Sequence, residues 1–214
     1  MSTLPIRIRE VVRPDGTRVR ELLVFCPREA TSSSPDRCAR CGYRCPPENE
    51  ALAPAVGCNV EPASEEGASS SDGLLYGPHA AASRVPAGAA SAQVVVCIQA
   101  DTPLSVASRV AESNRRWLAF PVVDETGVLL GSVPTAVLTL AADDERARFI
   151  ATAESMVPSF AVRESDRLDE VIGTMTSHHL RHVPIIDDAR RVTGLLTDIE
   201  LLRWVARGAP ARWR

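Results

Sequence analysis

The chain has 214 residues, of which 45% are hydrophobic and only 4% aromatic. That length suits one domain of ordinary size with a smaller module beside it, and so few aromatic residues offer little surface on which nucleic-acid bases could stack. The 24 Lys and Arg residues are balanced by 27 Asp and Glu residues, which gives a net charge of -3. Without a global positive field, attraction to nucleic acid or to anionic membranes is not expected.

The sequence predicts neither a membrane span nor a secretory signal. No apolar run approaches the length that crosses a bilayer. The amino terminus carries charge from Arg7 onward, where a signal peptide would have its apolar segment. We therefore expect a cytoplasmic protein.

The first element in chain order is a β-hairpin. Two β-rich segments, Ile6–Val12 and Val19–Phe25, flank a turn that contains Pro14 and Gly16. Pro pre-sets the first corner of such a turn, and Gly accepts a positive φ angle there. The hairpin and the cysteines that follow it are predicted to form a small module over residues 1–60.

Five of the six cysteines lie in this module, at positions Cys26, Cys38, Cys41, Cys45 and Cys58. Two residues separate Cys38 from Cys41, a spacing with which two thiolates chelate one metal ion. Four thiolates around Zn²⁺ would close a structural site and contribute on the order of 10 kcal/mol to a segment with almost no core. We predict Cys26, Cys38 and Cys41 as zinc ligands, with either Cys45 or Cys58 as the fourth.

Other chemistries remain open for this cysteine cluster. An iron–sulfur cluster also takes four cysteines, a redox-active thiol set is a second alternative, and disulfides are a third. The ligand spacing favours zinc, and a cytoplasmic location argues against disulfides. Cys97 lies inside an apolar run and is expected to be a core thiol.

Residues 61–92 are predicted to form a flexible linker. From about Pro46 to Ala92 the sequence is rich in Pro, Ala, Ser, Gly and Glu, and it includes the polar run Ser64–Ser71. Such a segment cannot offset its ordering entropy by burial. The sequence leaves open whether the module at residues 1–60 touches the rest of the chain.

The second half of the chain contains one pattern twice. Phe120–Asp124 followed by Gly131–Val133 in the first copy corresponds to Val183–Asp187 followed by Gly194–Thr197 in the second. In both copies an amphipathic helical stretch precedes the pattern and a helix follows it, which predicts a β-α-β-β-α unit. Because so short a repeat must pack against a neighbour, we expect one pseudo-symmetric domain. The predicted first repeat, second repeat and tail are residues 93–150, 151–208 and 209–214.

This pattern resembles a tandem pair of cystathionine β-synthase (CBS) domains, often called a Bateman module. Its most specific segments are Arg181–Asp187 and Val192–Glu200, while the first copy is a weaker match over about Gln93–Ala142. The resemblance implies an α+β fold, association into a homodimer, and a regulatory role that depends on AMP, ADP, ATP or S-adenosylmethionine. An enzyme is not expected, because the chain has no Walker-type phosphate loop and no nucleophile elbow.

The resemblance also assigns ligand-binding residues, mainly in the second repeat. In the family, phosphate and ribose are held where a Gly-hydrophobic-hydrophobic-Thr/Ser-x-x-Asp segment passes from strand into helix, and helix amino termini attract phosphate in general. Thr197 fills the hydroxyl position and Glu200 the carboxylate position, whereas Pro134 and Val137 stand there in the first copy. At most one site of the usual kind is therefore expected. The predicted nucleotide-binding residues are Ser159, Phe160, Leu180, Arg181, Pro184, Thr197 and Glu200.

The competing interpretation is a dimerisation scaffold with degenerate ligand sites. Pro134, Val137 and Glu200 depart from the family pattern, and Thr197 has an ordinary explanation as a helix cap. In that case a zinc-ribbon-like head would recognise protein or nucleic acid. A nucleotide would raise the melting temperature under the first interpretation and leave it unchanged under the second.

Overall fold

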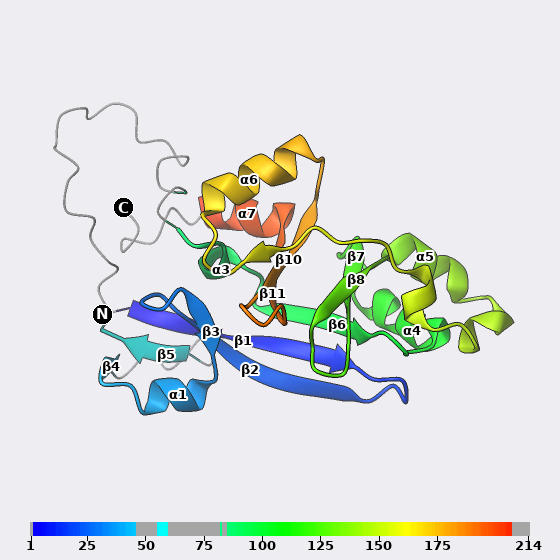
Figure 1. Cartoon of the computed structure of the whole chain (residues 1–214), viewed down its shortest axis with the longest axis horizontal. Coiled ribbons are helices and arrows are strands. Elements are labelled where there is room, and N and C mark those ends of the chain that lie inside the picture. The colour runs from blue at the N-terminus through cyan, green and yellow to red at the C-terminus, as the bar shows by residue number, and fades with distance from the viewer. Residues whose placement is uncertain (1, 46–54, 60–81, 83–84, 207–214) are drawn as a thin grey trace.

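The computed structural model describes residues 2–45, 55–59, 82 and 85–206. One sheet of eight strands contains the first repeat, and a separate sheet of three strands contains the second. Figure 1 shows the second repeat, with α6 and α7, above the long strands β1 and β2, and the helices α4 and α5 at the opposite end from the amino terminus. No helix within these described residues is long and apolar enough to cross a membrane.

The elements have the following bounds. The strands of the larger sheet are β1 (Ser2–Val12), β2 (Arg18–Cys26), β3 (Thr31–Ser33), β4 (Arg44–Cys45), β5 (Ala55–Cys58), β6 (Val94–Gln99), β7 (Ala119–Val123) and β8 (Leu129–Pro134). The smaller sheet contains β9 (Val162–Arg163), β10 (His182–Ile186) and β11 (Val192–Thr197). The helices are α1 (Pro35–Ala39), α3 (Ala87–Ala90), α4 (Leu104–Ser113), α5 (Thr135–Ala141), α6 (Leu168–Ser177) and α7 (Asp198–Ala206), with 3-10 turns η1 (Glu145–Arg148) and η2 (Thr152–Ser155).

Both repeats fold as β-α-β-β-α units. The first consists of β6, α4, β7, β8 and α5, and the second of β9, α6, β10, β11 and α7. In each unit the first two strands are parallel, because the helix between them carries the chain back, and the last two form an antiparallel hairpin. The predicted α+β fold of the repeats is confirmed.

The repeats exchange the segments that precede them. The backbone N–H of Leu168 in the second repeat donates to the carbonyl of Val85 at 2.8 Å, and that of Leu104 in the first repeat donates to the carbonyl of Ile150 at 2.9 Å. Ala82 and Val85 accordingly lie in the apolar core of the second repeat, although they precede the first. Since each core takes side chains from the other repeat's leading segment, the two repeats form one pseudo-symmetric unit.

The exchange corrects the end of the predicted linker. Instead of a flexible chain as far as residue 92, residues 85–92 form α3 and its flanks, and they pack against the second repeat with Val85 and Ala90 buried. Small side chains allow this close approach: a Cβ added to Gly88 would lie 3.2 Å from Cβ of Glu164 in the second repeat and would overlap the ring of Phe25 in β2. The rest of the predicted linker, residues 61–81 and 83–84, lies outside the described residues.

A glycine in each repeat lets an exchanged segment approach its backbone. A Cβ added to Gly131 would lie 2.7 Å from the carbonyl oxygen of Val157, and one added to the equivalent Gly194 would lie 2.9 Å from Oγ of Ser91. Both distances are too short for carbon. Close packing between the repeats thus explains the glycine that the sequence pattern contains twice.

The amino-terminal hairpin belongs to the sheet of the first repeat. β1 pairs antiparallel with β2 and parallel with β6, in a register that runs from Ile8 opposite Val94 to Val12 opposite Ile98. The resulting strand order is β3-β2-β1-β6-β7-β8. The hairpin therefore covers the edge of β6, which would otherwise present unpaired backbone groups.

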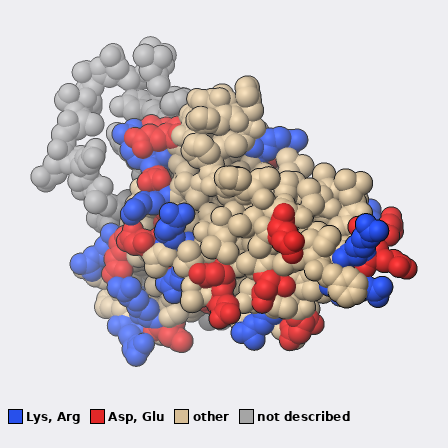
Figure 2. Space-filling model, turned by 45° about the vertical axis from the view of Figure 1, so that its right-hand side comes forward, with Lys and Arg blue, Asp and Glu red and all other residues tan. Residues whose placement is uncertain are grey.

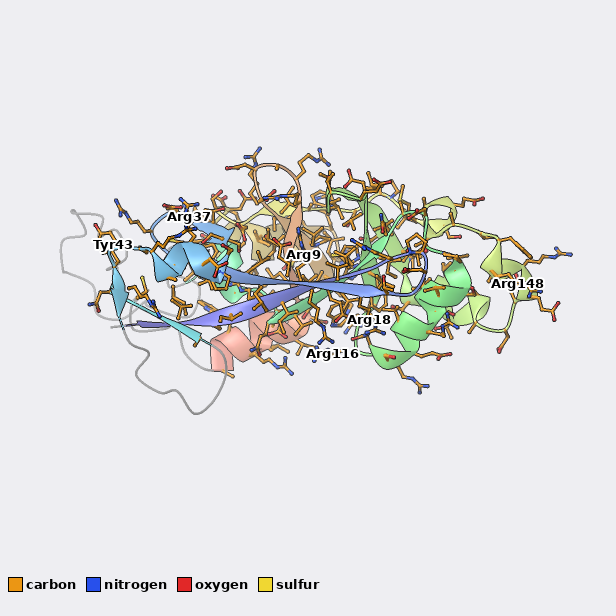
Figure 3. The ribbon with its side chains drawn as sticks, turned by 90° about the horizontal axis from the view of Figure 1, so that it is seen from below. Arg9, Arg18, Arg37, Tyr43, Arg116 and Arg148 are labelled. Atoms are coloured by element: carbon orange, nitrogen blue, oxygen red, sulfur yellow. The ribbon has the colours of Figure 1, made fainter. Side chains whose placement is uncertain are left out.

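Strands β1 and β3 also contact the second repeat. The buried carboxylate of Glu164 accepts hydrogen bonds from the backbone N–H of Ser32 at 2.5 Å and from Oγ1 of Thr31 at 3.1 Å. Nη1 of Arg9 donates to the carbonyl of Val192 at 3.0 Å, and Figure 3 shows Arg9 midway along the hairpin. The hairpin and the cysteine segments attached to it, residues 2–45 and 55–59, are called the head below. The head bridges both repeats.

Gly131→Ala is expected to destabilise the fold by about 1–3 kcal/mol, because the added methyl group must displace the Val157 backbone. Gly173→Ala is the matched control, since nothing lies within 4 Å of that position in α6. The control should be stabilising by about 0.8–1 kcal/mol through helix propensity. Urea denaturation of both variants measures these changes, and a Gly131→Ala variant as stable as the parent would contradict the close approach.

Candidate functional site

A cleft of about 350 Å³ lies between the two repeats. The first repeat contributes Leu118, Ser132 and Pro134, the crossing segment before β9 contributes residues 157–160, and the connection from α6 to β10 contributes residues 179–182. In Figure 2 the upper middle of the visible face is made of uncharged residues, with charged residues to either side of it. The volume suits a small-molecule ligand.

The backbone conformation at the end of α6 places residues of the second repeat in the cleft wall. At the end of α6 the N–H of His178 donates to the carbonyl of Thr174 at 3.1 Å, and the N–H of His179 donates to the carbonyl of Thr176 at 3.3 Å. His179 then adopts a φ of 54°, the left-handed conformation that commonly ends a helix. The chain turns there, and residues 179–182 line the cleft.

Four of the seven predicted nucleotide-binding residues line this cleft, and three do not. Those that line it are Ser159, Phe160, Leu180 and Arg181. Pro184 is buried in β10 opposite Leu195, Thr197 ends β11, and Glu200 lies in the first turn of α7.

Thr197 and Glu200 have structural partners at the start of α7. Oγ1 of Thr197 accepts a hydrogen bond from the backbone N–H of Glu200 at 3.2 Å, and the Glu200 carboxylate pairs with Arg203 at 2.7 Å. These are an ordinary helix cap and an ordinary ion pair along a helix. Thr197 nonetheless pairs across the hairpin with His182, so the amino terminus of α7 adjoins the cleft wall.

Arg181 brings a permanent positive charge to the cleft. Its Nε donates to Oδ2 of Asp198 at 2.9 Å, and the Asp198 N–H donates to the Arg181 carbonyl at 3.1 Å. The Arg181 side chain is 65% exposed, so this ion pair contributes little to stability. An anionic ligand would compete for the guanidinium without leaving a buried charge unpaired.

The remaining cleft surface combines hydroxyls with exposed apolar groups. Oγ of Ser132 donates to Oγ of Ser159 at 2.9 Å, which joins the first repeat to the crossing segment. Leu118, Val157 and Phe160 are each about half exposed. Such a surface suits a ligand with a flat apolar part and a polar or anionic part.

His182 also lines the cleft, although the sequence did not single it out as a ligand-binding residue. Burial lowers the pKa of His182, and the neighbouring Asp198 carboxylate opposes this effect. Its buried Nδ1 has no hydrogen-bond partner among the described residues. The imidazole is therefore neutral at pH 7, and it offers an unsatisfied polar atom beside the cleft. Its place directly before the Val-Pro strand pattern was the available signal.

The cysteines predicted to bind metal gather in the head. Cys26 ends β2, Cys38 lies in α1, Cys41 follows that helix, and Cys58 ends β5. Burial raises the pKa of the Cys38 thiol, and the thiols of Cys26, Cys41 and Cys58 raise it further. In the described part of the chain, however, no three His, Cys, Asp or Glu side chains are arranged to hold a metal ion. The side chain of Cys45 lies outside the described residues.

Comparison with known proteins finds a family match in both repeats. Residues 91–135 and 153–207 match the family model of the CBS domain. The CBS domain of a bacterial CNNM/CorC family Mg²⁺ transporter, solved in complex with ATP, is similar with a TM-score of 0.52 and 15% identity over 58% of this chain and 89% of that chain. Protein MJ1225 from Methanocaldococcus jannaschii has a TM-score of 0.52 and 17% identity over 57% of this chain and 50% of that chain. None of the curated proteins matches the chain. At these identities the likeness to solved structures shows the fold alone.

His182→Gln is expected to weaken the acid sensitivity of the fold. Because burial lowers the pKa of His182, the unfolded chain binds this proton more tightly than the folded chain. The stability from the neutral imidazole is fully present above the unfolded pKa of about 6.5 and is lost as pH falls toward the folded pKa. Urea denaturation at about pH 7.5 and about pH 5.5 should show a smaller loss for His182→Gln than for the parent.

The matched control is His179→Asn. His179 is exposed, and Asn tolerates its positive φ. This variant should lose as much stability on acidification as the parent. Equal losses in all three proteins would show that His182 does not contribute to acid sensitivity.

Proposed function

We propose that this protein is a non-enzymatic regulator whose cleft between the repeats binds an adenosine-type ligand, since residues 91–135 and 153–207 match the family model of the CBS domain. The observation that supports the proposal is the cleft itself, where Ser159, Phe160, Leu180 and Arg181 meet the first repeat. The similar CBS domain of the bacterial Mg²⁺ transporter was solved with ATP, a member of the proposed ligand class.

The cleft offers a partner for each part of such a ligand. The base would lie against the half-exposed Phe160 and against Leu180, and the hydroxyl of Ser159 would bind a polar edge. A phosphate would draw Arg181 away from its exposed pair with Asp198. The amino terminus of α7, which begins at Asp198, would add its positive dipole.

Ligand binding would regulate through the relative position of the repeats. One cleft wall comes from the first repeat, including Ser132, and the other from the second, including Arg181. A ligand that contacts both walls stabilises the arrangement of the repeats in which it can reach both. The size of this stabilisation is the difference between its binding free energies for that arrangement and for the alternatives. The head, which contacts both repeats, would follow this change.

AMP, ADP, ATP and S-adenosylmethionine should be tested by thermal-shift titration of the whole chain. A ligand that binds the cleft is expected to raise the melting temperature, since about 100 times its dissociation constant adds about 2.7 kcal/mol of stability. For a chain of this size that corresponds to roughly 5–10 °C. The absence of a rise with all four ligands would favour the dimerisation scaffold.

The variants Phe160→Ala and Arg181→Ala separate cleft binding from other effects. Phe160→Ala should weaken every ligand, and Arg181→Ala should weaken the phosphate-bearing ones more than S-adenosylmethionine. Arg203→Ala is the matched control, because Arg203 is an exposed arginine in a similar ion pair with Glu200. Thr197→Ala is a poorer test, since loss of its cap would lower stability by about 1 kcal/mol without any ligand.

We also propose that two copies associate through the closing helices. Leu140 in α5 is 80% exposed and Leu202 in α7 is 65% exposed, with Ile199 and Val205 half exposed beside it. α5 and α7 are equivalent elements of the two repeats, so the pseudo-symmetry presents an apolar face from each. A second copy of the chain would cover both faces with one isologous contact.

The double variant Leu140→Asp/Leu202→Asp is expected to sediment as a monomer under conditions in which the parent sediments as a dimer. Burial of two carboxylates in the interface would cost several kcal/mol. Leu22→Asp, on the exposed face of β2, is the control and should remain a dimer. Identical sedimentation of the parent and the double variant would contradict the proposed interface.

A further inference from the structure

The cysteine end of the head has a very small apolar core. Its buried members are Leu4, Val24 and Cys58, and Cys38 and Val56 pack against them half-buried. Three buried side chains remove little apolar surface from water compared with the conformational entropy of ordering the surrounding turns. Small modules of this kind generally hold their fold with a covalent or metal cross-link.

Three separate segments bring cysteines to this cluster. Cys26 pairs with Thr31 at the end of β2, and Cys58 pairs with Ser2 at the end of β5. Between them in the chain, the N–H of Cys41 donates to the carbonyl of Cys38 at 3.1 Å. Two thiols separated by two residues on one tight turn are the usual half-site for a tetrahedral metal.

We propose that Cys26, Cys38, Cys41 and Cys58 bind a zinc ion as a four-thiolate structural site. Thiolates select zinc among the common divalent cations, and four of them complete its tetrahedral coordination. Cys38 packs against the apolar cluster that contains the buried Cys58, and the Cys41 N–H donates to the Cys38 carbonyl, so thiols from two segments adjoin. No three of the described side chains are arranged to hold a metal ion, so zinc would draw the four thiols into ligating positions as it binds.

Cys58, and not Cys45, is assigned as the fourth ligand. Cys58 is 8% exposed and belongs to the cluster against which Cys38 packs. The strand register pairs Cys58 with Arg44 and places Cys45 opposite Gly57. Cys58 also anchors β5 to β1, so a metal bound there ties the most distant cysteine segment to the hairpin.

Closing this site would also fix the head on the second repeat. Cys26 pairs with Thr31, and Thr31 and Ser32 donate to the buried carboxylate of Glu164. Figure 3 shows Arg37 and Tyr43 at this end of the molecule, opposite Arg148 at the end of the first repeat. Zinc would therefore stabilise the contact between head and repeats, and this inference does not depend on ligand binding in the cleft.

The whole chain should be purified under reducing conditions and its metal content measured by inductively coupled plasma mass spectrometry. We expect one zinc ion per chain. Replacement by Co²⁺ should produce thiolate-to-cobalt charge-transfer absorption and the visible bands of tetrahedral coordination. Removal of zinc with a chelator should lower the melting temperature. Failure of the reduced protein to hold zinc or to give the cobalt spectrum would overturn the site, and bound iron with sulfide would overturn its assignment to zinc.

Serine variants identify the ligands. Cys41→Ser is the decisive one, because Cys41 is exposed and its replacement leaves the apolar cluster intact. It should lose most of the bound metal, as should Cys26→Ser, Cys38→Ser and Cys58→Ser. Cys97→Ser is the control: that thiol is buried in β6, where burial raises its pKa to about 12, and this variant should retain the metal.

Cys45→Ser should retain the metal as well. Loss of metal in Cys45→Ser, with retention in Cys58→Ser, would overturn the choice of the fourth ligand. Full retention in Cys41→Ser would overturn the proposed site as a whole. If Cys58→Ser fails to fold, the Cys45→Ser and Cys41→Ser results still decide between these outcomes.

Discussion

Neither repeat completes its core without the segment that precedes the other repeat, and this exchange fixes the positions of the two sheets. Ser132 in β8 and Val157 in the crossing segment form two backbone hydrogen bonds, at 2.9 Å and 2.8 Å. They hold the crossing segment against the first repeat, and the next residues, through Phe160, form one wall of the cleft. The cleft is thus a consequence of the exchange.

The head breaks the pseudo-symmetry of the repeats. In the first repeat, β1 covers the edge of β6 along its length, from Val94 to Ile98. In the second repeat, β9 is two residues long, it is the edge strand of its sheet, and residues 158–161 before it are not in a strand. Ser159 and Phe160 therefore keep exposed surface that their counterparts in β6 have lost. This asymmetry agrees with a single ligand site per chain, as Pro134 in the first repeat also suggested.

The local sequence pattern predicted the strands and helices well, because turn-forming residues and the spacing of hydrophobic residues involve only a few neighbouring positions. The segments Ile6–Val12 and Val19–Phe25 lie within β1 and β2, and the two repeats have the predicted order of elements. Long-range partners were not predictable in this way. Nothing in Ile8 or its neighbours specifies parallel pairing with β6, and the Ala and Gly residues of α3 have the same composition whether they form a linker or a closely packed helix.

In the candidate site, too, local features were predictable from the sequence and long-range contacts were not. Ser159, Phe160, Leu180 and Arg181 line the cleft because they flank strands whose register the repeat determines. Thr197 and Glu200 match a linear motif, yet the Thr197 hydroxyl accepts from the Glu200 backbone N–H and the Glu200 carboxylate pairs with Arg203. A linear motif gives residue types and spacing, whereas side-chain partners depend on rotamers and neighbours that the motif does not contain. The position of His182 in the cleft wall and the packing of Cys38 against the cluster that contains Cys58 required the tertiary structure for the same reason.

One short segment connects the cleft to the head. Phe160 lines the cleft, and Glu164, four residues later, holds Thr31 and Ser32 of the head. At about 3.3 Å per extended residue, roughly 13 Å of chain separates the two contacts. Between them β9 pairs with β10, and the Glu164 N–H donates to the Ile186 carbonyl at 3.1 Å. Phe160 and Glu164 flank the edge strand β9, the first at the cleft and the second at β3 of the head. A ligand that displaced Phe160 and a metal that ordered Cys26 would therefore bias the position of one common element, which is the physical requirement for coupling between two sites.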